Sequence, residues 1–148
     1  MYTSPSKHPD DSTIKDIYQP LFDKYGVDLV FSSDNHNYQR TFPLKYNNNA
    51  DSSNPIIIDT NQDYYNYNLD NTGVIYLITG TTERSHYALE GQTPFAAKQD
   101  DKHFGFLNID INGDTLEGTF YANEPQPNYN YIDAQSNIID QLTVSKID

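Results

Sequence analysis

An apolar run that stops at a polar turn constrains this chain more than any other feature. Residues 27–31 read Val-Asp-Leu-Val-Phe, and their apolar side chains do not alternate strictly with polar ones. Such a run is typical of a strand buried on both faces, so we expect it in the centre of a sheet. The turn that follows carries Asp34 and His36, and then come Tyr38 and Arg40. Because alternate residues at a strand end can point toward one ion, Asp34 and His36 are candidate metal ligands, with His36 facing a cavity or an exposed half-site.

A helix is predicted immediately before this strand. Large apolar residues recur there with the period of one helix face, at Ile14, Ile17, Tyr18, Leu21, Phe22 and Tyr25. Ser12 or Thr13 can cap the start, and Gly26 supplies a typical stop. Pro20 lies inside the pattern and removes a backbone donor, so it is expected to kink or split the helix. A helix that feeds a buried strand is half of a βαβ unit, and the sequence offers no strand before it.

The remainder of the chain predicts mostly strands. They are expected at residues 74–78, 104–111, 115–121 and 141–144. Asn112-Gly113 readily takes positive φ and predicts a hairpin between the second and third of these. Residues 44–71 are rich in Asn, Asp and Tyr, and we interpret them as a loop insertion on the surface. We therefore expect residues 1–148 to form a single α/β domain, with one main helix and a mostly β remainder.

The charge balance excludes some classes of function. The 148 residues include 21 Asp and Glu against 9 Lys and Arg, which gives a net charge of −12. This field repels nucleic acid and anionic membranes, and it slows the approach of a phosphate ester unless bound cations invert it locally. The chain has no Cys, so a thiolate metal site and a cysteine nucleophile are excluded. No apolar run approaches the ~20 residues of a membrane span. The richness in Tyr, Asn and Asp favours an extracellular or cell-surface location.

The order of these motifs resembles the calcineurin-like metallophosphoesterases, in their purple acid phosphatase branch. Residues 27–40 are similar to the apolar strand, the G-H-x-H turn and the x-Tyr-x-Arg sequence of that family, with Ser33 and Asp34 in place of Gly and His. Further similar segments, in family order, are residues 1–4, 74–81, 84–87, 105–107 and 139–144. The resemblance implies that the chain is the C-terminal half of a metallophosphoesterase αββα sandwich, a partial domain of that fold.

The resemblance also implies a metal site. The family holds two metal ions, iron with zinc or manganese, which activate a water and bind the phosphate. His36 matches one of its ligands, Asp34 stands in place of another, and His8 lies where related phosphatases keep a histidine that contacts substrate phosphate. From the residues alone, alternatives stay open: His36 as a hydrogen-bonded turn histidine, Asp34 as an Asx-turn residue, and His8 as part of a flexible start.

Two functions follow from this comparison. The first is a phosphoesterase-family hydrolase fragment, whose ancestral reaction is metal-assisted phosphate-ester hydrolysis and which is expected to be inactive without an N-terminal half. The alternative is a non-catalytic extracellular or surface module that kept the fold and lost the metal site. The expected partner is that N-terminal half or a second copy, joined through an exposed strand edge at residues 27–31. Tyr38 and Arg40 are interpreted as structural, with the ring packed and the guanidinium paired with a carboxylate.

Overall fold

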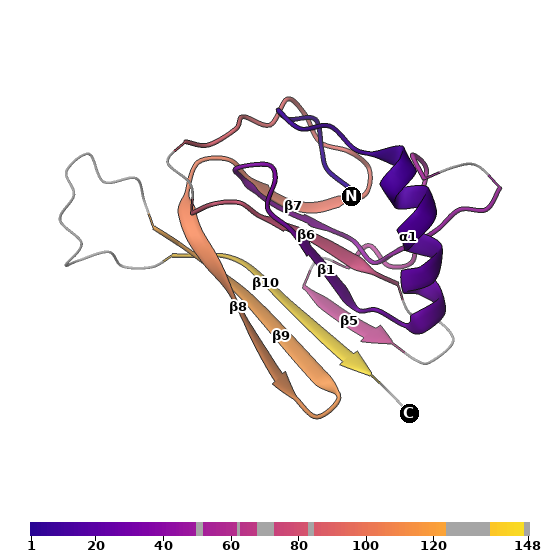
Figure 1. The fold of residues 1–148 in the computed structure, drawn as a ribbon. Coiled ribbons are helices and arrows are strands. Elements are labelled where there is room, and N and C mark those ends of the chain that lie inside the picture. The colour runs from indigo at the N-terminus through magenta and orange to yellow at the C-terminus, as the bar shows by residue number, and fades with distance from the viewer. Residues whose placement is uncertain (50–51, 62, 68–72, 83–84, 124–136, 147–148) are drawn as a thin grey trace.

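A computed structural model of the chain describes residues 1–49, 52–61, 63–67, 73–82, 85–123 and 137–146. Helix α1 (Ser12–Tyr25) lies beside one four-stranded sheet, and a second four-stranded sheet lies beyond it (Figure 1). The first sheet contains, in spatial order, β1 (Leu29–Ser32), β6 (Ile75–Thr79), β2 (Tyr38–Thr41) and β7 (Ala96–Asp100). The second contains β5 (Tyr64–Tyr67), β10 (Asn137–Lys146), β9 (Thr115–Asn123) and β8 (Phe104–Asn112). A short third sheet pairs β3 (Leu44–Lys45) with β4 (Ile56–Ile57).

One helix with mixed sheets confirms the predicted α/β class. In the two large sheets β1 runs parallel to β6 and β5 runs parallel to β10, whereas the other neighbours are antiparallel. The predicted hairpin is present, because β8 and β9 pair over their whole length and Gly113 has a φ of 58°. That angle is one that side-chain-bearing residues rarely adopt, so the glycine fits the turn.

Two apolar clusters hold the layers together. The first joins the two large sheets and contains Tyr38, Tyr65, Ile75, Leu77, Phe120, Ala122, Leu142 and Val144. The second includes residues of the first sheet and of the N-terminal segment, namely Tyr2, Phe42, Leu44, Val74, Tyr76, Phe95 and Ala97. Strand β6 gives Ile75 and Leu77 to the first cluster and Tyr76 to the second, so it is apolar on both faces.

A buried ion pair crosses the first cluster. The Arg40 guanidinium donates from Nε and Nη2 to the two carboxylate oxygens of Asp140, at 2.6 and 2.8 Å, and from Nη1 to the Tyr65 hydroxyl at 2.9 Å. The Tyr38 hydroxyl donates to the same carboxylate at 2.7 Å, and its ring stacks on Phe120 with centroids 4.1 Å apart. The interpretation of Tyr38 and Arg40 as structural residues is therefore confirmed.

The prediction that residues 27–31 form a central strand is wrong. In the described sheet β1 pairs with β6 alone and lies at the edge, and its Phe31 side chain is 51% exposed. Leu29 packs against the cluster between the sheets and Val30 against the other cluster, so both faces of β1 meet a layer. The apolar residues on the two faces of β1 reflect its contacts with these two layers. A strand at the edge of a sheet can have this pattern as well as a central strand, so the pattern does not distinguish the two positions.

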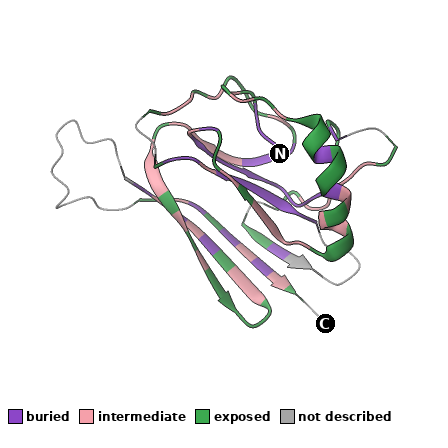
Figure 2. Cartoon of the chain, viewed as in Figure 1, coloured by how far each residue is buried: buried purple, intermediate pink, exposed green. Residues whose placement is uncertain are grey.

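Helix α1 forms where expected and ends at Gly26 as predicted, but its N-terminal cap and its orientation differ from the prediction. The cap is Asp11, whose side chain accepts from the Ile14 amide at 3.0 Å, and Gly26 ends the helix with a φ of 64°. Pro20 lies inside α1 without interrupting it. Most of the apolar stripe faces solvent, as Figure 2 shows, with exposed fractions of 41–72% at Ile14, Ile17, Tyr18, Leu21 and Tyr25. Its sixth residue, Phe22, packs against the second cluster.

Polar side chains occupy the buried side of α1 instead. Lys15 and Gln19 are 1% and 0% exposed. The Lys15 ammonium is 2.6 Å from Asp10 Oδ2 and lies over the Tyr2 ring, and the Tyr2 hydroxyl donates to Gln19 Oε1. These partners compensate the loss of water around the Lys15 ammonium and Gln19 Oε1, whereas Gln19 Nε2 is buried without a hydrogen-bond partner in the described structure.

The segment at residues 44–71 is more than a surface loop. It contains β3, β4 and β5, of which β5 joins the second sheet beside β10. Leu44 and Tyr65 are fully buried, and each belongs to one of the two apolar clusters. The expectation of a solvated surface loop is wrong at these positions. The polar and aromatic composition of the segment as a whole gave no indication that single residues in it complete the core.

Candidate functional site

Asp34 and His36 lie at the carboxyl end of β1, in the turn that leads to β2, whereas His8 lies in the N-terminal segment before α1. Gly80 follows β6 and packs against this turn. A Cβ atom placed on Gly80 would lie 2.1 Å from the Asn35 carbonyl oxygen and 2.7 Å from that of Ser33. The turn therefore approaches the end of β6 so closely that only glycine fits there.

His36 is held in one orientation by the loop after β6. Its ring stacks on the Tyr87 ring with centroids 4.0 Å apart and an interplanar angle of 11°. Its Nδ1 atom lies 3.1 Å from the Ser85 carbonyl oxygen, and its own carbonyl accepts from the Tyr87 amide at 3.0 Å. Because a carbonyl can only accept, Nδ1 carries a proton in this contact and the lone pair of the neutral ring is on Nε2. Metal-binding histidines usually have this arrangement.

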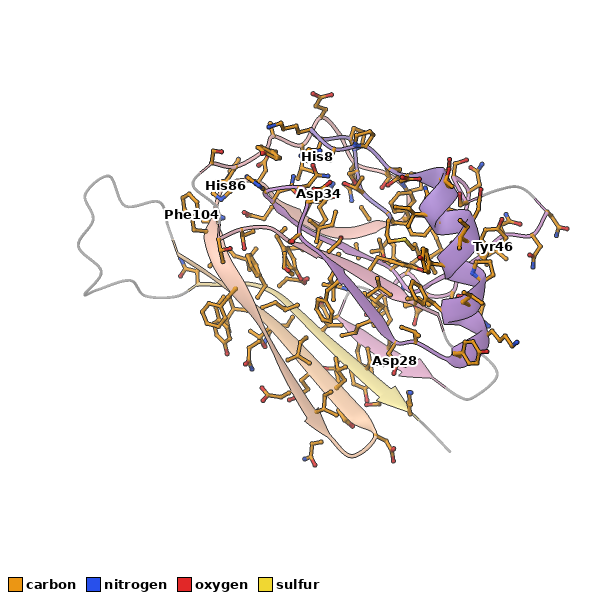
Figure 3. All side chains as sticks on the ribbon, viewed as in Figure 1. His8, Asp28, Asp34, Tyr46, His86 and Phe104 are labelled. Atoms are coloured by element: carbon orange, nitrogen blue, oxygen red, sulfur yellow. The ribbon has the colours of Figure 1, made fainter. Side chains whose placement is uncertain are left out.

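His8 and Asp34 lie close to one another, as Figure 3 shows. The distance from His8 Nδ1 to Asp34 Oδ2 is 3.7 Å, and the two side chains are 40% and 83% exposed. The His8 ring is also 5.7 Å from the Tyr87 ring, measured between centroids. The fold thus brings His8, Asp34 and His36 to one place, with Tyr87 in contact with both histidines.

Three buried amide side chains fix the N-terminal segment over this turn. Asn35 connects the turn to His8: its Oδ1 accepts from the His8 amide at 2.9 Å, and its Nδ2 donates to the His8 carbonyl at 2.8 Å and to Thr3 Oγ1 at 3.0 Å. Asn35 is 2% exposed. Since both hydrogen-bonding groups of this amide are used, the backbone of His8 is held at a defined position above the turn.

Asn37 and Gln39 extend this connection. Asn37 Nδ2 donates to Ser6 Oγ and to the Tyr87 carbonyl, at 3.1 and 3.0 Å. Gln39 Oε1 accepts from the Ser4 amide at 2.7 Å, while its Nε2 donates to Asn37 Oδ1 at 2.9 Å. This role was not predicted, although amides at the alternate positions 35, 37 and 39 are a signal for one polar face along the turn and β2.

Lys7 also meets Tyr87. Its Nζ donates to the Tyr87 hydroxyl at 3.1 Å and lies 4.2 Å from the centroid of the ring. Tyr87 therefore contacts Lys7, His8 and His36, although it was predicted only as part of a similar segment. The contact between the two chain segments depends on tertiary structure, and no local pattern in the sequence indicates it.

The other two histidines have separate roles: His103 lies between β7 and β8, and His86 lies in the loop between β6 and β7. His103 Nδ1 lies 2.7 Å from Asp100 Oδ2, and the His86 ring packs against Phe104 with centroids 4.2 Å apart (Figure 3). Burial lowers the pKa of His86, and nearby Asp100 and Asp101 only partly oppose this. These contacts are those of structural residues in a turn.

The described residues do not fit a dinuclear metal centre. Within the parts of the chain that the structure describes, no three side chains of His, Cys, Asp and Glu lie close enough together to hold one ion. His36 has the tautomer of a ligand, and Asp34 is an exposed carboxylate nearby that pairs with His8. This arrangement supplies ligands for at most part of a site, so no catalytic step follows from these residues alone.

Comparison with known proteins identifies similar chains. The uncharacterized protein Rv2577 of Mycobacterium tuberculosis is 38% identical over 71 residues, which are 47% of this chain and 13% of that protein. An acid phosphatase of Aspergillus ficuum is 33% identical over 106 residues, which are 69% of this chain and 17% of that protein. No family model matches the chain.

A solved structure shows the same fold. The purple acid phosphatase from yellow lupin (Lupinus luteus) seeds matches with a TM-score of 0.64 and 25% identity, over 86% of this chain and 19% of that chain. This confirms a phosphoesterase-like fold with one helix and mixed sheets. The chain spans less than a fifth of the length of each of these relatives. In the described part of the chain, no helix is long and apolar enough to cross a membrane.

Proposed function

We propose that this chain supplies one metal-binding turn of an acid-phosphatase-type metallophosphoesterase, which hydrolyses phosphate esters with the help of bound metal. This is the turn between β1 and β2 that carries His36, called the histidine turn below. The observation that carries the proposal is the geometry of His36. Its Nδ1 atom is bonded to the Ser85 carbonyl, and its ring is fixed by Tyr87, so Nε2 is prepared to bind a cation. The similarity to the acid phosphatase of A. ficuum and to the lupin purple acid phosphatase supports the same function.

In this proposal the chain contributes His36, with Asp34 as a second ligand and His8 as a contact to substrate phosphate. The two metal ions are iron with zinc or manganese, and their chemistry is the activation of water and the binding of phosphate. The remaining ligands come from an N-terminal half of the same fold. A net charge of −12 makes the metal essential, because without it the field of the chain opposes the approach of a phosphate ester.

The N-terminal half has a surface on which to dock. The apolar face of α1 is exposed, and β1 offers an unpaired edge in the described sheet. A strand added beside β1 would cover Phe31, which is 51% exposed, and a neighbouring layer would cover the helix. Exposed apolar patches and open strand edges of this kind mark interaction surfaces in folded proteins.

Titration with Zn²⁺ tests the role of His36. Addition of Zn²⁺ to the ¹⁵N-labelled chain is expected to shift the Nε2 resonance of His36, and His36→Ala should lose this binding. His103→Ala is the control, because His103 already bonds to Asp100. Asp34→His should raise the Zn²⁺ affinity by about tenfold or more, since imidazole is a better zinc ligand than an exposed carboxylate. An equal Zn²⁺ response from the chain and from His36→Ala would overturn the proposal.

The chain alone is expected to show no turnover of a chromogenic phosphate ester with added iron, zinc or manganese. The reason is the number of ligands, since His36 and Asp34 cannot position two ions. Robust metal-dependent turnover that His36→Ala abolishes would show instead that the described residues, or those around them, complete the site unaided.

A second candidate function is a non-catalytic module at the cell surface or outside the cell. It is favoured by Asp34, which is 83% exposed and whose ion-pair partner is His8. A lack of Zn²⁺ binding at His36, together with no gain in Asp34→His, would favour this second function.

A further inference from the structure

We propose that Lys7, held in place by Tyr87, is an anion contact that binds the phosphate group at this site. The inference rests on the proposed function and names a residue that neither the motifs nor the resemblance assigns. Three observations carry it: the position of Lys7 beside His8, the neutrality of its bonding partner, and the charge of the rest of the molecule.

The position of Lys7 is fixed from two directions. On one side, its ammonium donates to the Tyr87 hydroxyl at 3.1 Å and lies over the Tyr87 ring at 4.2 Å. On the other, its neighbours Ser6 and His8 are bonded to the buried amides of Asn37 and Asn35. A long and flexible side chain therefore starts from a fixed backbone and ends at a fixed aromatic ring, which reduces the entropy lost when it binds a ligand.

The same ring places Lys7 at the histidine turn. Tyr87 stacks on His36 at 4.0 Å and lies 5.7 Å from His8. Tyr87 therefore links Lys7 to the two histidines, and Lys7 is also next to His8 in the chain. An anion that binds the Lys7 ammonium would lie beside the turn that carries His36.

The charge of Lys7 is not neutralised within the described structure. Lys15 and Lys146 pair with the carboxylates of Asp10 and Asp28, at 2.6 and 2.9 Å. The partner of Lys7 is a neutral phenol and its ring, which leave the full positive charge and further N–H donors for a ligand. In a molecule of net charge −12, Lys7 thus supplies a positive charge next to His8, where the exposed Asp34 carboxylate, 3.7 Å from His8 Nδ1, is the opposing negative group.

Binding of inorganic phosphate to the metal-free chain tests this inference. The titration is followed by the amide resonances of Lys7, His8 and Tyr87 at constant ionic strength, with chloride as the control anion. Lys7→Gln is expected to weaken binding by about tenfold, which corresponds to the loss of one charge-assisted hydrogen bond. Lys7→Arg should bind phosphate nearly as well as the original chain, because it keeps the charge.

Two further variants separate the contact from general effects of charge and folding. Lys102→Gln removes one exposed lysine elsewhere and should leave phosphate binding unchanged. Tyr87→Phe removes the hydroxyl but keeps the ring, and it should weaken binding less than Lys7→Gln does. If Lys7→Gln and Lys102→Gln bind phosphate equally, or if chloride causes the same shifts, the inference is wrong.

The outcome is independent of the test of the proposed function. Phosphate binding that depends on Lys7, in a chain whose His36 takes no Zn²⁺, would support the anion contact and reject the metal site. Zn²⁺ binding at His36 with no effect of Lys7→Gln on phosphate would support the metal site and reject the anion contact.

Discussion

Asp140 is the residue on which the buried charges of this protein depend. Its carboxylate accepts from Arg40 and Tyr38, and these three side chains are 6%, 1% and 0% exposed. Breaking a buried ion pair leaves the remaining charge without compensation, which costs about 3–5 kcal/mol. We expect Asp140→Ala to lower the free energy of unfolding by about this amount, as measured by urea denaturation.

An exposed carboxylate supplies the control for this prediction. Asp110→Ala, on the open face of β8, should change the free energy of unfolding by less than about 0.5 kcal/mol. A loss in Asp140→Ala no larger than that in the control would contradict the assigned role of the pair.

At the level of single residues, the sequence predicted most of what local chemistry decides. It identified Tyr38 and Arg40 as structural, which the structure confirms, whereas the roles of His8, Asp34 and His36 stay predictions. It did not identify Asp140 or Tyr87, because each reaches its partners from a distant part of the chain, 100 residues away for the Arg40–Asp140 bond. Contacts of that kind depend on strand order, which no motif encodes.

At the level of elements, the N-terminal segment depends on the amides at alternate positions of the turn and β2. Asn35→Ala removes the acceptor of the His8 amide proton. We expect hydrogen exchange at His8 to accelerate by about tenfold or more, which is the effect of losing ~1.4 kcal/mol of local protection. Exchange at Leu107 and Phe120, in the β8–β9 hairpin, should stay unchanged. If exchange at His8 is equally slow in Asn35→Ala, other contacts hold the segment.

The turn between β7 and β8 gives the chain a source of acid sensitivity. Partial burial of Asp100 pushes its pKa up, but hydrogen bonds from the amides of Lys102 and His103 and from the His103 ring outweigh this, so its pKa is lowered. A carboxylate with a lowered pKa stabilises the folded state above its unfolded pKa, and this stability is lost as the pH falls through the folded pKa.

We therefore expect stability to decrease below about pH 4, in part through protonation of Asp100. Asp100→Asn should be less stable than the original chain at pH 7, and the difference between the two should shrink as the pH falls to 3. Thermal melting at a series of pH values measures it. A constant difference over this range would show that the charge of Asp100 has no part in the effect.

Elements were predictable where one local rule determines them. The Asn112-Gly113 turn, the apolar run of β6 and the period of α1 each had a clear pattern, and each element formed. Strand β7 reads Ala-Ala-Lys-Gln-Asp and had no pattern, because its pairing with β2 is set by the sheet. The buried face of α1 was also not predictable, since the bonds of Lys15 to Asp10 and of Gln19 to Tyr2 reverse the usual rule that apolar residues face inward.

At the level of the whole molecule, α1 and β1 expose apolar surface of the kind that another layer usually covers. The exposed side of α1 carries five large apolar side chains, and strand β1 has an unpaired edge in the described sheet without Lys or Pro to protect it. The apolar pattern of residues 27–31 could not distinguish this edge from the centre of a sheet. A chain with such a surface has a reason to associate with copies of itself.

We expect the purified chain to self-associate weakly, and more strongly as salt is added. The apolar face of α1 favours association, whereas a net charge of −12 opposes it, and this repulsion is screened with a Debye length of about 10 Å at 0.1 M salt and about 3 Å at 1 M. Replacing Ile17 and Leu21 by Ser should reduce the association at every salt concentration, while Phe106→Ser, which removes an equally exposed ring from β8, should not. Sedimentation velocity over a salt series measures the effect, and circular dichroism checks that each variant is folded. A monomer that is indifferent to salt and to the loss of Ile17 and Leu21 would contradict the prediction, and it would mean that exposed apolar residues on α1 do not by themselves form an adhesive surface.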